Sequence, residues 1–76
     1  MEVILIKKDW DYTLYKKNNQ YFLEVICGSV ALFEIKIQLN EEEISNYLEK
    51  GEVYIEEMAR TIQENPSKWK ERTIAK

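Results

Sequence analysis

Apolar and polar side chains alternate along the first half of the chain with the two-residue period of β-strands. The pattern predicts strands at Glu2–Lys7, Asp11–Lys17, Tyr21–Cys27 and Val30–Leu39. The last strand alternates most regularly, and its apolar side chains are expected to face inward together: Phe33, Ile35, Ile37 and Leu39. Sequential strands of this kind form an antiparallel meander of three or four strands.

Two tight turns are predicted between the later strands. Asn18-Asn19 suits a type I′ hairpin turn, because asparagine tolerates the positive φ that both central positions require. Gly28-Ser29 places glycine at the first central position, as a type II′ turn prefers. Each would be a two-residue connection between neighbouring strands.

The second half of the chain changes to the period of an α-helix. Asn40 is a suitable N-cap, and Glu43 three residues later completes a capping box, with Leu39 and Ile44 spaced as a hydrophobic staple. An apolar stripe follows at helical spacing: Ile44, Tyr47, Leu48, Gly51, Ile55, Met58, Ala59 and Ile62. We expect the stripe to pack on the sheet, as one kinked helix or as two short helices that break at Gly51.

Asn65-Pro66 ends the helical pattern, because proline disfavours helical geometry in the residue before it. The same pair can open a last helical turn that carries Trp69. The chain is therefore expected to be a single α+β domain over residues 1–76, with helices packed on one face of the meander. Its parts are a β-meander (1–39), a helical segment (40–65) and a basic C-terminal tail (66–76).

The composition argues against catalysis and against a bound cofactor or metal. The 76 residues include no His, which removes the most common general base and metal ligand, and only two Gly, which excludes a phosphate-binding glycine loop. A single Cys forms no internal disulfide, which fits a reducing cytoplasm, and Cys27 falls on the apolar face of its strand as a small buried side chain. The apolar run Val3–Ile6 is too short to cross a membrane. A catalyst that uses carboxylates alone is the least favoured class.

Charge divides the chain more sharply than its net value of −3 indicates. Residues 41–64 carry eight glutamates against Lys50 and Arg60, and most of them lie off the apolar stripe, so we expect them to face water together. One interpretation is a solvated face that keeps a small protein soluble. The other is a surface that attracts a basic protein partner. The candidate partner-binding residues are Glu42, Glu49, Glu52, Glu56 and Glu57.

An alternative is a homodimeric module that binds nucleic acid or a small ligand. The tail segment Ser67–Arg72 interleaves basic residues with Trp69, and Lys7, Lys8, Lys16 and Lys17 could extend a positive surface. Nucleic-acid binders are usually basic, whereas the isoelectric point of this chain is about 5.0. Dimerisation is plausible on size alone, because a core this small barely offsets the entropy of ordering the chain.

Three stretches resemble small bacterial immunity proteins of polymorphic-toxin systems, including contact-dependent growth inhibition. They are Tyr21–Val30 (YFLEVICGSV), Phe33–Ile44 (FEIKIQLNEEEI) and Asn65–Arg72 (NPSKWKER). These stretches are mostly turn, capping and core signals, so no functional residue is carried over from the family. The resemblance implies a small cytoplasmic protein that binds and neutralises a cognate toxin.

The capping box generates the first prediction. Asn40→Ala removes the side-chain acceptor at the helix start and is expected to lower the free energy of unfolding by about 1 kcal/mol, whereas Asn40→Asp and Asn40→Ser keep an acceptor and cost little. Chemical denaturation of the three variants measures the difference. Equal effects in all three would mean that the helix begins elsewhere.

Overall fold

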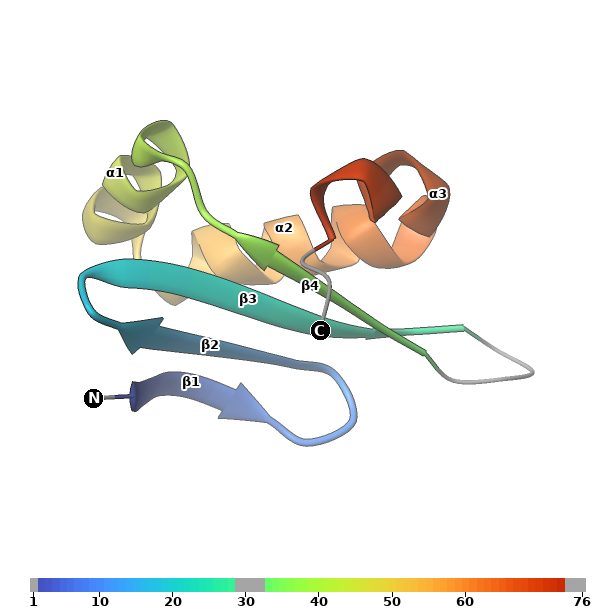
Figure 1. Cartoon of the computed structure of the whole chain (residues 1–76), viewed down its shortest axis with the longest axis horizontal. Coiled ribbons are helices and arrows are strands. Elements are labelled where there is room, and N and C mark those ends of the chain that lie inside the picture. The colour runs from blue at the N-terminus through green and yellow to red at the C-terminus, as the bar shows by residue number, and fades with distance from the viewer. Residues whose placement is uncertain (1, 29–32, 74–76) are drawn as a thin grey trace.

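A computed structural model describes residues 2–28 and 33–73 of the chain. Four strands form one antiparallel sheet in the order β1-β2-β3-β4, so each strand pairs with its neighbour in sequence. Their bounds are β1 (Glu2–Lys8), β2 (Tyr12–Lys17), β3 (Gln20–Cys27) and β4 (Phe33–Gln38). The sheet is the four-stranded meander that the alternation predicts, and β1 and β4 are its edges (Figure 1).

The turn at Asn18-Asn19 is confirmed. Both asparagines have positive φ, 51° and 67°, and Lys17 pairs with Gln20 across the turn. The turn at Gly28-Ser29 is wrong as a two-residue connection, because Cys27 pairs with Phe33 and not with Val30. Gly28 does adopt a positive φ of 103°, but the register leaves residues 28–32 between the strands, and 29–32 lie outside the described residues.

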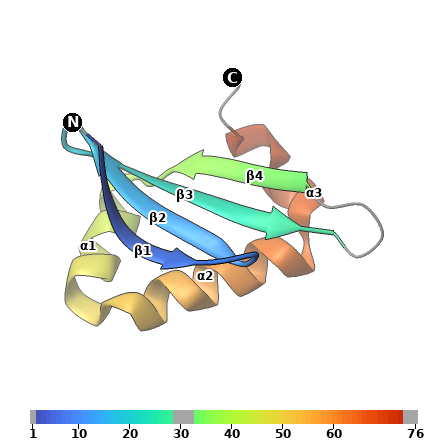
Figure 2. The same cartoon turned by 90° about the horizontal axis from the view of Figure 1, so that it is seen from below.

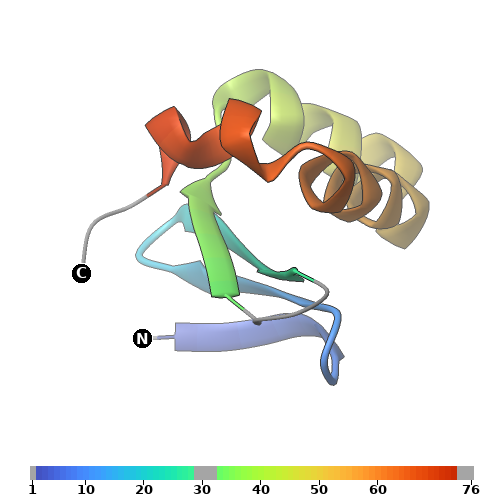
Figure 3. The ribbon, with the colours of Figure 1, turned by 90° about the vertical axis from the view of Figure 1, so that its right-hand side faces the viewer.

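Helices follow the sheet and cover one of its faces, while no helix or strand of residues 2–28 and 33–73 covers the other face (Figures 2 and 3). They are α1 (Glu41–Lys50), α2 (Glu52–Glu64) and α3 (Pro66–Trp69), and a 3₁₀ turn, η1 (Lys70–Arg72), ends the described chain. This confirms the α+β class, and of the two alternatives left open by the sequence the structure has two helices that break at Gly51. The break favours glycine because of its backbone conformation, since Gly51 has a positive φ of 79°. Steric space is not the reason, because a Cβ at this position would meet no atom within 4 Å.

The start of α1 has the predicted capping box. The Asn40 side-chain oxygen accepts from the backbone N–H of Glu43 at 2.8 Å, and the Asn40 N–H donates to the Glu43 carboxylate at 2.9 Å. Pro66 stands at the first position of α3, as the sequence indicates. Local signals within a few residues of each other therefore placed both helix starts correctly.

The core lies between the sheet and α2. Leu14, Leu23, Val25 and Ile37 on the sheet are fully buried against the apolar side of α2, which consists of Ile55, Met58, Ala59 and Ile62. Tyr15 points to the opposite face of the sheet, where its ring stacks on that of Phe22 with centroids 5.3 Å apart. Within the described residues, no helix has the length and apolar character needed to span a membrane.

Two residues assigned to the core are instead exposed. Phe33 is 42% exposed, although it lies on the same face as Ile35 and Ile37, because it is the first residue of β4 and lies at the end of the sheet. Leu48 is 67% exposed, because the break at Gly51 interrupts the stripe and α1 does not continue the phase of α2. Alternation and helical spacing predict which face of an element a side chain lies on. They do not predict whether another element covers that part of the face.

This difference in burial generates a matched pair of stability predictions. Ile37→Ala is expected to cost about 2–5 kcal/mol, since Ile37 is fully buried and its removal leaves a cavity. Phe33→Ala should cost much less than the roughly 3–5 kcal/mol typical of a buried phenylalanine. Denaturant unfolding of both variants measures the contrast, and a loss at Phe33 equal to that at Ile37 would contradict the exposed position of this ring.

Candidate functional site

The five candidate glutamates lie on both long helices, but they do not share one face. Glu42 and Glu49 are exposed on α1, seven residues apart and therefore on the same side of that helix. Glu52 and Glu56 are one turn apart on α2, on the side next to β1. Glu57 lies on another side of α2, where it lines a pocket. The structure therefore separates the acidic set into three places.

Glu52 and Glu56 are already partnered within the chain. The ammonium of Lys8, from the edge strand β1, lies 3.4 Å from the Glu52 carboxylate and 3.9 Å from that of Glu56. The hydrogen bond to Glu52, with the charges of Tyr12 and Glu56, raises the pKa of Lys8. Arg60 also lies 3.7 Å from Glu56. These exposed ion pairs contribute little stability, but they reduce the negative charge that this side of α2 offers to a partner.

Glu43 was expected to face water with the other glutamates, and this is wrong. Its carboxylate is buried and accepts two hydrogen bonds from the Arg72 guanidinium, at 2.7 and 2.8 Å. Burial by itself raises the pKa of Glu43, but the hydrogen bonds from Arg72 and from the Asn40 backbone outweigh it, so the pKa lies below its ordinary value. In a capping box the Glu43 side chain folds back toward the backbone of Asn40. In this position its carboxylate also reaches the guanidinium of Arg72.

Arg72 shows that the described part of the C-terminal tail is docked on the domain. Its guanidinium also donates to the Gln38 carbonyl at 3.0 Å and lies 5.3 Å from the centre of the Trp69 ring. The next residue, Thr73, forms an isolated bridge with Ile37 of β4. The side chain of Trp69 packs against the core. The aromatic and basic groups of this segment are therefore engaged inside the molecule, which weakens the case for nucleic-acid binding through them.

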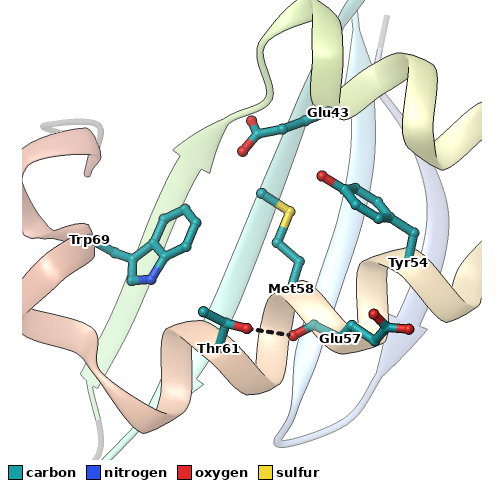
Figure 4. Close-up of a pocket in the computed structure, with 6 residues that line it drawn as sticks. All are labelled: Glu43, Tyr54, Glu57, Met58, Thr61 and Trp69. Atoms are coloured by element: carbon teal, nitrogen blue, oxygen red, sulfur yellow. Dashed lines mark hydrogen bonds between the residues drawn. The ribbon is translucent and has the colours of Figure 1, made fainter.

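A pocket of about 280 Å³ lies between α2, the start of α1 and α3. Figure 4 shows its lining: Glu43, Tyr54, Glu57, Met58, Thr61 and Trp69. The Thr61 hydroxyl donates to the Glu57 carbonyl at 3.0 Å, so the Glu57 carboxylate is not involved in that bond. The Trp69 indole N–H is buried and has no hydrogen-bond partner among the described residues. Aromatic rings, a thioether and carboxylates suit a cationic side chain better than an anion.

Two exposed apolar side chains flank the break between the helices. Leu48 near the end of α1 is 67% exposed and Val53 at the start of α2 is 63% exposed. Glu49 and Glu52 are their direct neighbours in the chain. The sequence did not identify this pair, since Leu48 was assigned to the core and Val53 to no site. The only available signal was the glycine that breaks the helix.

The remaining candidates for chemistry have structural roles. Cys27 is buried, as expected, and its thiol contacts the Val25 carbonyl at 3.8 Å, while burial raises its pKa and keeps the sulfur protonated. Among the described residues there is no group of three side chains that could hold a metal ion. Asp11 accepts two hydrogen bonds from Arg60 of α2, each 2.8 Å long, and these lower its pKa.

Comparison of the chain with protein-family models, curated proteins and solved structures finds no match to any of them.

The Glu43–Arg72 pair generates a prediction about pH. Because the pKa of Glu43 is depressed in the folded state, its stabilising contribution is present above the ordinary pKa of about 4.5 and is lost as the pH falls through the folded-state value. Glu43→Gln should therefore destabilise the protein at pH 7, and its difference from the wild type should shrink as the pH is lowered below about 4.5.

Denaturant unfolding at several pH values measures this difference. Glu41→Gln, which changes an exposed glutamate in the same helical turn, is the matched control and should show no comparable pH dependence. A Glu43→Gln effect that stays constant through the acidic range would mean that the carboxylate charge is not responsible.

Proposed function

We propose that this protein is a non-enzymatic inhibitor that binds a basic protein, and specifically an immunity protein that neutralises a toxin domain in the bacterial cytoplasm. The acidic surface of the helical layer supports the proposal. The resemblance of three stretches of the chain to immunity proteins of polymorphic-toxin systems points in the same direction. Toxin domains that act on nucleic acid present basic clefts for phosphates, and an acidic protein surface can occupy such a cleft.

The observation that carries the proposal is the exposed pair Leu48 and Val53 beside glutamates at the break between α1 and α2. A surface that only keeps a protein in solution needs charge and no exposed apolar side chains. A protein interface combines both, because apolar contacts supply affinity and charge supplies orientation and rate of association. Glu42 and Glu49 on α1 are exposed and are the candidates to steer the partner.

The pocket beside this surface has room for a lysine or arginine side chain of the partner. Glu57 lines the pocket together with Tyr54 and Trp69. Arg72 already lies over the Trp69 ring and Lys50 over the Tyr54 ring, so a partner cation would compete with these two side chains. Residues that insert into pockets commonly account for most of the binding energy of an interface. A partner that binds at this pocket would contact Glu57 on α2 together with Glu42 and Glu49 on α1.

The test uses the product of the reading frame that adjoins the gene for this chain as the candidate toxin. Its expression should arrest growth of a host cell, and co-expression of this chain should relieve the arrest. The double variant Glu42→Lys, Glu49→Lys should bind it with an association rate at least about tenfold lower at low salt, because attraction becomes repulsion, and the difference should narrow as salt rises. Stopped-flow or surface-based kinetics measure the rate.

The matched control is Asp9→Lys, Glu34→Lys, which changes the net charge equally at exposed positions of the β-meander and not of the helical layer. It should keep most of the association rate and the relief of growth arrest. An equal loss in both double variants would assign the effect to net charge and not to this face. A neighbouring product that is harmless, or that does not bind this chain, would refute the proposal.

A further inference from the structure

The two edges of the sheet are not equivalent. At the β4 edge, Thr73 forms a bridge with Ile37 and Arg72 donates to the Gln38 carbonyl, so the end of the described chain covers part of that strand. The β1 edge has no such cover: in the part of the chain that the structure describes, β1 pairs only with β2. Figure 1 shows β1 as the outermost strand of the sheet, with no further described strand beside it.

The open edge is apolar in its middle. Val3, Ile4 and Leu5 are 49%, 56% and 38% exposed, which makes this the longest run of exposed large apolar residues in the described chain. A seven-residue edge strand with unpaired backbone groups is a template for a further strand. Proteins usually protect such edges with charges or bulges, and β1 has both. The charges of Glu2 and Lys7 have opposite signs and lie at the two ends of the apolar run, which favours pairing with a strand of the opposite charge order.

An irregularity in β1 determines this arrangement. The register with β2 shifts between Ile4 and Ile6, which is the mark of a β-bulge. Without it, Glu2 and Lys7 would lie on opposite faces, because side chains alternate along a strand. With it, Glu2 pairs with Lys17 and Lys7 with Thr13, and both of these β2 residues lie on the open face of the sheet with Tyr15. Glu2 and Lys7 therefore share the open face at the two ends of the apolar run.

We propose that a second copy of this chain pairs with it through β1, antiparallel to the first β1, to form one continuous eight-stranded sheet with twofold symmetry. Antiparallel pairing brings the acidic end of each β1 beside the basic end of the other, so that Glu2 of each copy meets Lys7 of its partner on the same face. Val3 and Ile6, both on the inner face, face each other in this register, and Ile4 and Leu5 lie at the centre. A parallel arrangement would instead place like charges together.

The pairing does not use the inner-side contacts of Lys8. Lys8 can keep its ion pairs with Glu52 and Glu56, since neither Glu2 nor Lys7 takes part in them. One strand pair buries less area than the roughly 1,200–2,000 Å² of a standard interface, so we expect a weak dimer that depends on protein concentration and on salt. This inference does not rest on the proposed toxin partner.

Sedimentation equilibrium of the full chain over a range of protein concentrations tests the proposal. The mass should rise from 9.1 kDa toward twice that value with increasing concentration, and the transition should move to higher concentration as salt is added. Lys7→Glu makes both charged ends of the strand acidic, and Glu2→Lys makes both basic. Each variant alone should remain monomeric where the wild type dimerises.

The decisive measurement mixes the two single variants. The acidic and the basic strand complement each other, so the equimolar mixture should regain a dimer, and the double variant Glu2→Lys, Lys7→Glu should dimerise alone like the wild type. Circular dichroism of each variant verifies that it is folded. A wild type that stays monomeric at the highest concentration would overturn the proposal. A dimer that persists unchanged in both single variants would also overturn it, because a different face would then be in use.

Discussion

The burial of one face of the sheet under α2 is the interaction on which the rest of the structure depends. A meander of four strands has no partner for either face, and a small domain has too little core to leave both in water. Ile55, Ala59 and Ile62 of α2 cover Leu23 and Ile37, and all five are inaccessible to solvent. One helix does most of this covering. The chain changes direction at Gly51 between α1 and α2, β1 remains an edge of the sheet, and the opposite face carries the stacked rings of Tyr15 and Phe22 under Lys36.

The second constraint is the ion pair between Glu43 and Arg72, which fixes the C-terminal segment to the start of α1. The carboxylate that caps α1 is also the acceptor for the guanidinium of the C-terminal segment, so the helix start, the end of β4 and the tail meet at one buried pair. A buried ion pair of this kind is weak evidence for net stability, but the removal of one partner leaves the other unpaired and is costly. Glu43 also lines the pocket, so the carboxylate that holds the tail borders the candidate binding site.

The charges are distributed between two surfaces with different chemistry. The exposed side of α1 presents Glu42 and Glu49 with Leu48, which suits a basic protein with some apolar area. The β1 edge presents one acidic and one basic end around an apolar centre, which suits a copy of itself. Lys8 separates the two surfaces, because its contacts with Glu52 and Glu56 neutralise the side of α2 that lies between them.

Features that depend on neighbouring residues could be predicted from the sequence. A period or a φ preference within a few positions predicts the four strands, the asparagine turn, the capping box at Asn40, the break at Gly51 and the turn at Pro66. The way in which these elements meet follows from packing between distant segments. The tertiary structure exposed Phe33 and Leu48, turned Glu43 inward, lengthened the connection after Gly28 and divided the candidate glutamates among three places. The physical reason is that burial, ion pairing and pocket formation depend on the distance between segments far apart in the chain, and no local pattern encodes that distance.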